Sequence, residues 1–396
     1  MDLSLPHIST ERVKKAFIKN SENFIVEEID LNGNIYEVEK KYKPKWEKEE
    51  DYVVGVLQKK NWTTDGCIKK ICKALKISKK RVSFAGYKDK DATTTQLFSI
   101  YKLKPEDIEK IKIRDVKILG SWYWDRPIKS GDLLGNRFTV KIGLKEDEIL
   151  LLGEILEEID YYIPNYYGPQ RFGIRKNNHK IGKLIIKEDF LSAIVEYLST
   201  PKENEDPEIK KIRKNLRDSL DFKTAFKEYP TFLKNERKIL EHLHKNPKDY
   251  VGALRTLKKT LVLFINAYQS YLFNKILSNK VKEERIFDIS EGEYFCGLNW
   301  YSFPDIKRIN GKIPVGKIIG YDTELNKEEK ELLDEEGIDK KLFKSKKIPE
   351  LSSRGGYRAL VVPIKDFTAE NSFISFELPA GSYGTVALSE LFESVK

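Results

Sequence analysis

The chain has few of the residues that form covalent or metal cross-links. It contains three cysteines and four histidines among 396 residues. Cys67, Cys72 and Cys296 are odd in number and show no CxxC spacing, so the sequence indicates neither a disulfide framework nor a zinc site. His242 and His244 do not complete a ligand set, and a surface location is the preferred interpretation of this pair. We therefore expect no metal.

Long apolar runs are also missing. No stretch approaches the roughly 20 apolar residues that a membrane-spanning helix requires, and the N-terminal sequence MDLSLPHIST lacks the apolar region of a signal peptide. The sequence thus favours a cytoplasmic protein with no membrane partner. A single methionine combined with 34% charged residues is similar to the composition of heat-adapted proteins.

The charge balance is basic. Lysine and arginine number 72 against 62 for aspartate and glutamate, a formal net charge of +10. This excess fits a polyanionic partner such as RNA but does not identify one. Neither a P-loop nor a dinucleotide-binding glycine pattern is present, so no cofactor is expected. The length is sufficient for two domains that each bury a core.

One stretch combines a strand pair with a charged loop. The apolar run Val82–Ala85 stops at Gly86, and Thr93–Ile100 has the composition of a half-buried strand. Between them, Asp89 lies between two lysines, and nearby positive charge keeps a carboxylate ionised. Such a group can act as a nucleophile or a proton acceptor. From these residues alone, a solvated and charge-balanced turn is the more frequent alternative.

A second stretch, residues 163–173, reads IPNYYGPQRFG. It is a loop divided by proline and glycine that carries aromatic rings, an amide and a guanidinium group. Such groups stack on unpaired bases and bond to their edges. Composition alone favours a packed structural loop. Similarly Phe24, at the start of the predicted strand 24–29, reads by itself as a core residue.

These stretches resemble the TruD family of pseudouridine synthases, in its archaeal type. The first carries the pattern AG-Y-KDK-x-A-x-T-x-Q over residues 85–96, and the second is similar to the family's VPNYFGxQRFG. Further similar segments follow the family's order: NFIVEE at 23–28, NAYQSYLFN at 266–274 and FELPAGSYGTV at 376–386. The chain departs from the pattern at Gly384, usually alanine, and at Ser389, usually arginine. The missing arginine affects one peripheral contact.

The resemblance assigns roles to individual residues. The family's catalytic aspartate corresponds to Asp89. Its nucleotide-binding asparagine corresponds to Asn165, and the aromatic residue that stacks on the target corresponds to Tyr167. The matched positions implied to contact or surround the substrate are Lys19, Phe24, Asn165, Tyr167 and Tyr383. Together with Asp89, the residues Asn165, Tyr167 and Tyr383 are expected to line one cleft between two domains.

The implied activity is isomerisation of uridine to pseudouridine in tRNA, first of all at position 13 of the D arm, without metal or cofactor. A catalytically silent tRNA-binding or tRNA-folding protein on the same scaffold is the alternative. The intact Asp89 motif favours the enzyme. The sequence carries no signal for the oligomeric state, and a monomer is the default expectation.

The pattern of elements predicts an α+β fold. Strands are expected near both ends of the chain, including 358–363 and 373–378, whereas helices such as 180–198 and 249–277 dominate the middle. The resemblance implies a pseudouridine synthase catalytic domain with a mixed, mainly antiparallel sheet, formed by residues 1–185 and 353–396. Residues 186–352 are expected to form an inserted, mainly helical α/β domain, the TRUD domain.

Overall fold

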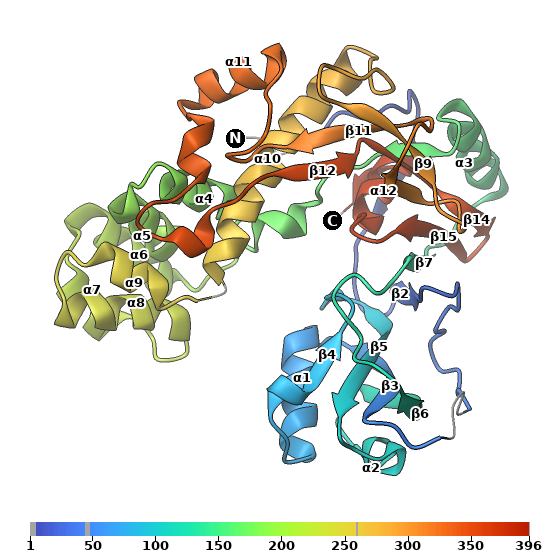
Figure 1. Cartoon of the computed structure of the whole chain (residues 1–396), viewed down its shortest axis with the longest axis horizontal. Coiled ribbons are helices and arrows are strands. Elements are labelled where there is room, and N and C mark those ends of the chain that lie inside the picture. Colours follow the sequence, from blue (N-terminus) through green and yellow to red (C-terminus); the bar gives the residue numbers. More distant parts are fainter. Residues whose placement is uncertain (1–4, 44–47, 259, 396) are drawn as a thin grey trace. The chain divides into compact units, whose positions relative to one another are not determined.

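The computed structural model describes residues 5–43, 48–258 and 260–395. The chain forms two compact units, each assembled from separate stretches of sequence (Figure 1). The sheet unit comprises residues 7–165, 298–305 and 361–396. The helical unit comprises residues 166–297 and 306–360, with Leu5 and Pro6 before them.

The sheet unit is built on an eight-stranded sheet of described residues, in the order β14-β15-β7-β2-β5-β3-β6, with β4 also paired to β5. Only the β2–β5 pair is parallel among these described pairings, which confirms the predicted mixed, mainly antiparallel sheet. The strands are β2 Phe24–Ile29, β3 Tyr52–Lys60, β4 Val82–Phe84, β5 Thr93–Tyr101, β6 Val116–Trp124, β7 Gly135–Lys141, β14 Lys365–Glu370 and β15 Phe373–Pro379. Smaller pairs are β1 Val13–Phe17 with β16 Phe392–Val395, and β8 Tyr162–Pro164 with β13 Val361–Pro363.

Two hydrophobic cores lie on one face of this sheet. The first packs β3 and β5 against α1, and its members include Leu57, Ile68 and Phe98. The second packs β2, β7 and β15 against α3 and α12, and Val26 and Phe138 belong to it. Residues opposite each other in neighbouring strands share a face of the sheet. The register of the strands shows that the side chains of both cores project from the same face. The helices of this unit are α1 Thr64–Ala74, α2 Pro105–Glu109, α3 Glu146–Glu158 and α12 Gly384–Leu391, with the 3₁₀ turn η1 Lys79–Arg81.

The helical unit surrounds the long helix α10, which packs on α4 and beside β11 (Figure 1). Its buried face holds Tyr268 and Leu272 within a continuous core of helix side chains. The helices are α4 Asn178–Ile186, α5 Phe190–Ser199, α6 Pro207–Ser219, α7 Phe222–Glu228, α8 Lys234–Lys245, α9 Tyr250–Arg255, α10 Thr260–Lys282 and α11 Lys327–Glu336, with 3₁₀ turns η2 Pro169–Phe172, η3 Lys340–Phe343 and η4 Pro349–Leu351.

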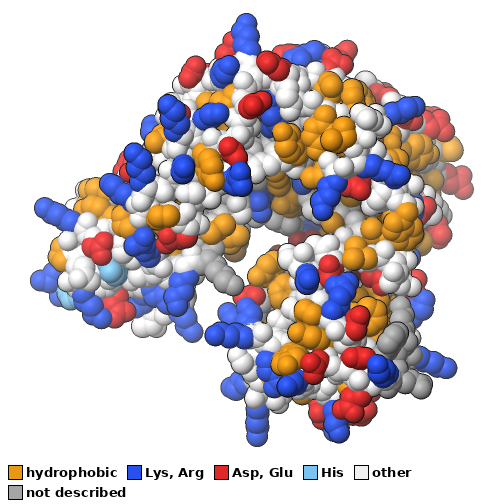
Figure 2. Space-filling model, in the orientation of Figure 1, with side chains coloured by type: hydrophobic (Ala, Val, Ile, Leu, Met, Phe, Trp, Pro, Cys, Tyr) orange, Lys and Arg blue, Asp and Glu red, His pale blue; other side chains and the backbone are white. Residues whose placement is uncertain are grey.

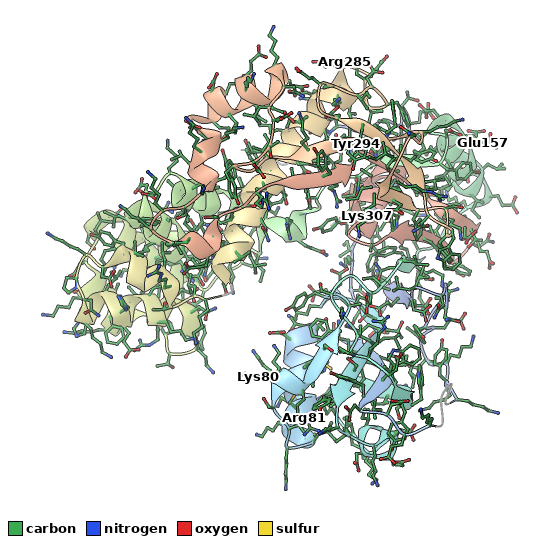
Figure 3. The ribbon with its side chains drawn as sticks, viewed as in Figure 1. Lys80, Arg81, Glu157, Arg285, Tyr294 and Lys307 are labelled. Carbon is green, nitrogen blue, oxygen red and sulfur yellow. The ribbon has the colours of Figure 1, made fainter. Side chains whose placement is uncertain are left out.

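A small sheet in the order β10-β9-β11-β12 completes this part of the chain. Tyr294 of β9 and Lys307 of β10 lie on neighbouring strands (Figure 3), and the Tyr294 hydroxyl donates a hydrogen bond to the Ile306 carbonyl at 2.6 Å. The strands are β9 Tyr294–Leu298, β10 Pro304–Ile309, β11 Ile313–Ile318 and β12 Gly356–Ala359. A capping box starts α11, because Asn326 and Glu329 bond each other's backbone amides.

Both long predicted helices are interrupted. The expected helix 180–198 is two helices, α4 and α5, because Glu188 adopts a left-handed φ of 57° between them and Asp189 caps the second. The expected helix 249–277 is likewise divided into α9 and α10, with Lys258 at a φ of 51° between them. Apolar periodicity continued across both interruptions and therefore did not reveal them.

One predicted strand and one bend also differ from what their local sequence favours. The run 358–363 is divided between β12, which pairs with β11, and β13, which pairs with β8, so one stretch serves two sheets. Asn32-Gly33 is a dipeptide that favours a type I′ turn, but this turn is absent from the described residues, since Gly33 alone has a positive φ there. The Asp30 carboxylate stabilises this bend instead, because it accepts hydrogen bonds from the backbone amides of Asn32 and Asn34.

Packing groups the chain differently from the predicted domain boundaries. Residues 166–185 belong to the helical unit because α4 packs on α10. Residues 298–305 belong to the sheet unit, where the Tyr301 hydroxyl donates to the Glu377 carboxylate at 2.9 Å. The inserted domain at 186–352 stays a prediction.

The described ranges contain neither a membrane-spanning helix nor a cluster of metal-ligand side chains. No helix there combines the length and apolar character needed to cross a membrane. No group of three or more histidine, cysteine, aspartate or glutamate side chains there is arranged to hold a metal ion.

Candidate active site on the Asp89 loop

The loop that carries Asp89, residues 85–92, joins β4 to β5 as the predicted hairpin. β3 pairs with β5 from end to end, so β2 and β4 must share the opposite edge of β5. β4 covers the last part of β5, while β2 covers Thr93 to Thr95 at its start. The chain leaving β4 cannot continue beside β5, because β2 already occupies that edge. The loop therefore leaves the plane of the sheet.

Hydrogen bonds to β5 and to α1 hold this loop. The side-chain amide of Gln96 donates to the Gly86 carbonyl at 3.1 Å. The backbone amide of Lys88 donates to the Thr64 hydroxyl of α1 at 3.0 Å. At the open end of the hairpin, Arg81 Nε donates a hydrogen bond to the Tyr101 carbonyl oxygen at 2.8 Å (Figure 3). The loop is thus attached to the two elements on either side of it.

The lysine that pairs with the Asp89 carboxylate is Lys19. Its Nζ lies 2.8 Å from Asp89 Oδ2. The adjacent Lys88 turns away into the protein, where it forms an ion pair with Glu28 at 2.8 Å and donates a hydrogen bond to Asn136 at 2.5 Å. Lys90 is exposed. The sequence predicted that the two flanking lysines would hold the carboxylate, and this is wrong. An ammonium group does pair with the carboxylate, but it belongs to a different lysine.

Lys19 is close to the loop because the segment before β2 is held against β5. The Thr93 hydroxyl donates to the Ser21 carbonyl at 2.7 Å, and the parallel pairing places Ile25 opposite Thr93. The carboxylate of Asp89 remains reachable, with 24% of its side chain exposed, whereas Lys19 is 10% exposed. An accessible carboxylate with a fixed counter-charge can take part in catalysis.

Phe24 lies under Lys19 and is entirely buried. Its ring packs against Phe17 and Phe138 at centroid distances of 6.2 and 5.9 Å, and Lys19 Nζ stands 4.5 Å from its centroid. Lys19, Phe24 and Asp89 therefore form one cluster. A direct nucleotide contact with Phe24 would require Lys19 to move.

Asn165 and Tyr383 belong to a second cluster on the sheet unit. Asn165 is buried, and its Oδ1 accepts a hydrogen bond from the Ser382 hydroxyl at 3.1 Å. Tyr383 follows directly and stands half-buried at the N-cap of α12, which begins at Gly384. The carboxyl end of β15 and the chain after β8 thus come together here.

Tyr167 belongs to the helical unit, where α10 fixes its backbone. Asn274 accepts a hydrogen bond from the Tyr167 amide and donates one to its carbonyl, each at 2.9 Å. The guanidinium carbon of Arg358 lies 4.1 Å from the ring centroid, and that of Arg171 lies 5.3 Å away. Tyr167 is 9% exposed, so its ring is held by cations in a mostly buried position. The expected common cleft of Asp89, Asn165, Tyr167 and Tyr383 stays a prediction.

Lys59, on β3, contacts the Asp89 loop and was not identified from the sequence. Its side chain is fully buried, and Nζ donates to the Asp89 carbonyl at 2.6 Å. Burial lowers the pKa of Lys59 to about 8, and the negative charge of Asp89 opposes that change. The only available sequence signal was the pair Lys59-Lys60 ending an apolar strand, which is an ordinary strand end.

The basic charge is distributed widely. Figure 2 shows lysine and arginine side chains over much of the visible surface, with aspartate and glutamate among them. A distributed excess gives long-range attraction for a polyanion but does not by itself locate the phosphate contacts.

Comparison with known proteins identifies the family. Residues 7–391 match the family model described as tRNA pseudouridine synthase D (TruD). The chain belongs to the TruD family. Among its TruD relatives, a "Probable tRNA pseudouridine synthase D" of Archaeoglobus fulgidus is 35% identical, covering 87% of this chain and 90% of the relative. One of the same description from Methanococcus maripaludis is 34% identical, covering 97% and 96%.

A solved TruD structure agrees with these matches. The crystal structure of the putative tRNA pseudouridine synthase D from Methanosarcina mazei superposes with a TM-score of 0.70 at 28% sequence identity and covers 99% of each chain. The predicted TruD family and α+β fold class are therefore confirmed.

Proposed function

We propose that this TruD protein converts uridine to pseudouridine in tRNA and that Asp89 is its catalytic residue. The observation that carries the assignment is the Asp89 carboxylate itself, which is 24% exposed and paired with Lys19 at 2.8 Å. The loop bearing it is held by Lys59 and by Lys88. A fixed, ionised and reachable carboxylate is what the start of this reaction requires.

The chemistry is an isomerisation. The bond between C1′ of the ribose and N1 of uracil breaks, the detached uracil turns, and C1′ bonds to C5. C5 then loses its proton and N1 gains one, so the overall atom count is unchanged. An ionised Asp89 can begin this sequence either by attacking carbon or by removing a ribose proton. Both routes use the same carboxylate at the same place.

The target base must first leave its stack, which costs a few kcal/mol and costs least where pairing is weak. We assign Asn165 and Tyr383 to positioning the nucleotide and Tyr167 to stacking on the base. The hydrogen bond from Ser382 fixes the orientation of the Asn165 side-chain amide, which supports a positioning role for Asn165. Lys19 serves as the counter-charge of Asp89, and Phe24, being fully buried, is the floor on which Lys19 rests.

The proposed substrate position is uridine 13 in the D arm of tRNA. Choice among uridines would come from RNA shape, because phosphate contacts give affinity that depends little on sequence. Carbodiimide mapping of pseudouridine in wild-type tRNA transcripts, and in transcripts with cytidine at position 13, tests this choice. Modification that persists elsewhere when position 13 is cytidine would show that the position is wrong while the reaction is right.

The reaction is tested by release of tritium from tRNA that carries tritium at C5 of uridine, since that hydrogen is lost. Wild-type protein is expected to release tritium, and Asp89→Asn is expected to bind the same tRNA and release none. Asp91→Asn, which removes an exposed carboxylate two residues away, is the matched control and should retain activity.

The alternative, a catalytically silent tRNA-binding or tRNA-folding protein, makes a different prediction. It would bind tRNA with salt-dependent affinity, and neither wild type nor Asp89→Asn would release tritium from any transcript. That result would refute the enzymatic proposal.

A further inference from the structure

A lysine is unusual at position 59, because the side chain there is fully buried. The side chain lies on β3 with no exposed surface, between Thr94 of β5 and Val116 of β6 in the strand register. An ammonium group has three hydrogen-bond donors. Within the described residues, the hydrogen bond from Nζ to the Asp89 carbonyl, at 2.6 Å, is the one that Lys59 makes, and no carboxylate forms an ion pair with it.

Other buried lysines in the chain have a carboxylate partner. Lys88 forms an ion pair with Glu28 at 2.8 Å, Lys280 with Glu293 at 2.9 Å and Lys317 with Glu329 at 2.9 Å. Taking an ammonium out of water without a paired anion costs several kcal/mol. An apolar side chain of the same length would fill the space without that cost. The fold alone therefore does not explain Lys59.

The surroundings of Lys59 connect it to the carboxylate. The charged and titratable groups that act on it are Asp89 and Lys88 of the loop, Lys19 before β2, and Cys67 of α1. The Cys67 thiol is buried and its pKa is raised to about 12, so it is neutral and supplies no negative charge at physiological pH. Asp89 is therefore the anion that favours the charged form of Lys59 in this cluster.

We propose that Lys59 is a positioning residue of the active site. Its ammonium anchors the Asp89 carbonyl from inside the protein and contributes positive charge beneath the carboxylate, while Lys19 supplies the counter-charge from outside. The inference rests on the proposed function, because it assigns Lys59 a role through Asp89. The unfavourable burial of the ammonium group is then explained by its role in fixing the position of Asp89.

The test uses two variants. Lys59→Met is one atom shorter than lysine, is unbranched like it, and removes the charge and the donors. Lys59→Arg keeps the charge and the donors. Single-turnover release of tritium from C5-labelled tRNA is measured from pH 6 to pH 10, with tRNA affinity measured by filter binding. Lys59→Met is expected to bind tRNA within about twofold of wild type and to react about 10²-fold more slowly, the size of effect that displacement of a catalytic group by about 1 Å produces. Lys59→Arg is expected to recover part of the rate.

The pH profile separates this role from a structural one. Wild-type activity is expected to fall as pH rises through about 8, the pKa of Lys59, because the ammonium becomes neutral. Lys59→Arg, which stays charged, should lack that fall, and Lys59→Met should be slow throughout. Lys317→Met, a buried lysine of the helical unit, is the control and should react at the wild-type rate per folded molecule.

Hydrogen exchange distinguishes failure of this inference from failure of the proposed function. Peptides covering residues 85–92 should exchange faster in Lys59→Met than in wild type, whether or not the protein is active. If wild type makes no pseudouridine but this change is seen, the anchoring role stands and the proposed activity is wrong. A Lys59→Met variant with wild-type rate, pH profile and loop exchange would overturn the inference.

Discussion

Replacing Lys59 with methionine is expected to make the sheet unit more stable at pH 7. Burial lowers the pKa of Lys59 from 10.5 to about 8. At about 1.4 kcal/mol for each pKa unit, keeping the buried ammonium charged costs about 3 kcal/mol. Methionine removes this cost and loses one hydrogen bond to the Asp89 carbonyl, worth about 1 kcal/mol. The net expectation is a gain of about 2 kcal/mol in the free energy of unfolding.

The sign of the pH dependence follows from proton binding. Between pH 8 and pH 10.5 the unfolded lysine still holds its proton, whereas folded Lys59 has begun to lose it. The unfolded state then binds more protons, so the stability of wild type rises with pH in this window. The advantage of Lys59→Met should therefore be largest below pH 8 and shrink towards pH 10.5.

Tryptophan fluorescence can follow this unfolding selectively. All five tryptophans lie within the residue ranges of the sheet unit. Denaturant titrations at pH 7 and pH 9.5 would compare Lys59→Met with wild type, and an unchanged slope with denaturant would show that the unfolded state is the same.

Lys88→Met is the matched control, because that lysine is buried in the same unit with a carboxylate partner. Removing it leaves Glu28 buried and unpaired, so a loss of about 3 to 5 kcal/mol is expected. Two buried lysines of one unit should thus shift stability in opposite directions. A Lys59→Met variant that unfolds at lower denaturant at pH 7 would refute the desolvation argument.

Two further substitutions test the two clusters. Lys19→Met should slow single-turnover tritium release by about 10²-fold, since it removes the counter-charge 2.8 Å from Asp89, and an unchanged rate would contradict the pairing. Ser382→Ala should raise the KM for tRNA a few-fold without changing thermal stability by more than a few degrees, because it frees the Asn165 amide from its 3.1 Å bond; a rate defect at saturating tRNA would instead place Asn165 in the chemical step.

Much of the local structure was predictable because it depends on short-range rules. The α1 helix begins where Thr63 caps the Gly66 amide, and its apolar residues recur at helical spacing. Interruptions of the longer helices were not predictable. Glu188 and Lys258 adopt left-handed conformations, which neither the apolar periodicity nor the residue type predicts.

The candidate site divides in the same way. Asp89 and Asn165 were found in the sequence because each lies in a continuous motif. Lys59 could not be found, since its role depends on a loop 30 residues away folding over its side chain. The division of residues 358–363 between two sheets was equally invisible, as pairing partners are not encoded in a single strand.

The sequence by itself therefore determined the family, the α+β class and the residue expected to react, because motifs and periodicity are local properties. The tertiary structure decided which charges act on that residue. Neighbouring side chains in an extended loop point in different directions, so Lys88 faces the interior and bonds Glu28. The parallel register of β2 and β5 brings Lys19 to Asp89, and a register is a property of two strands together.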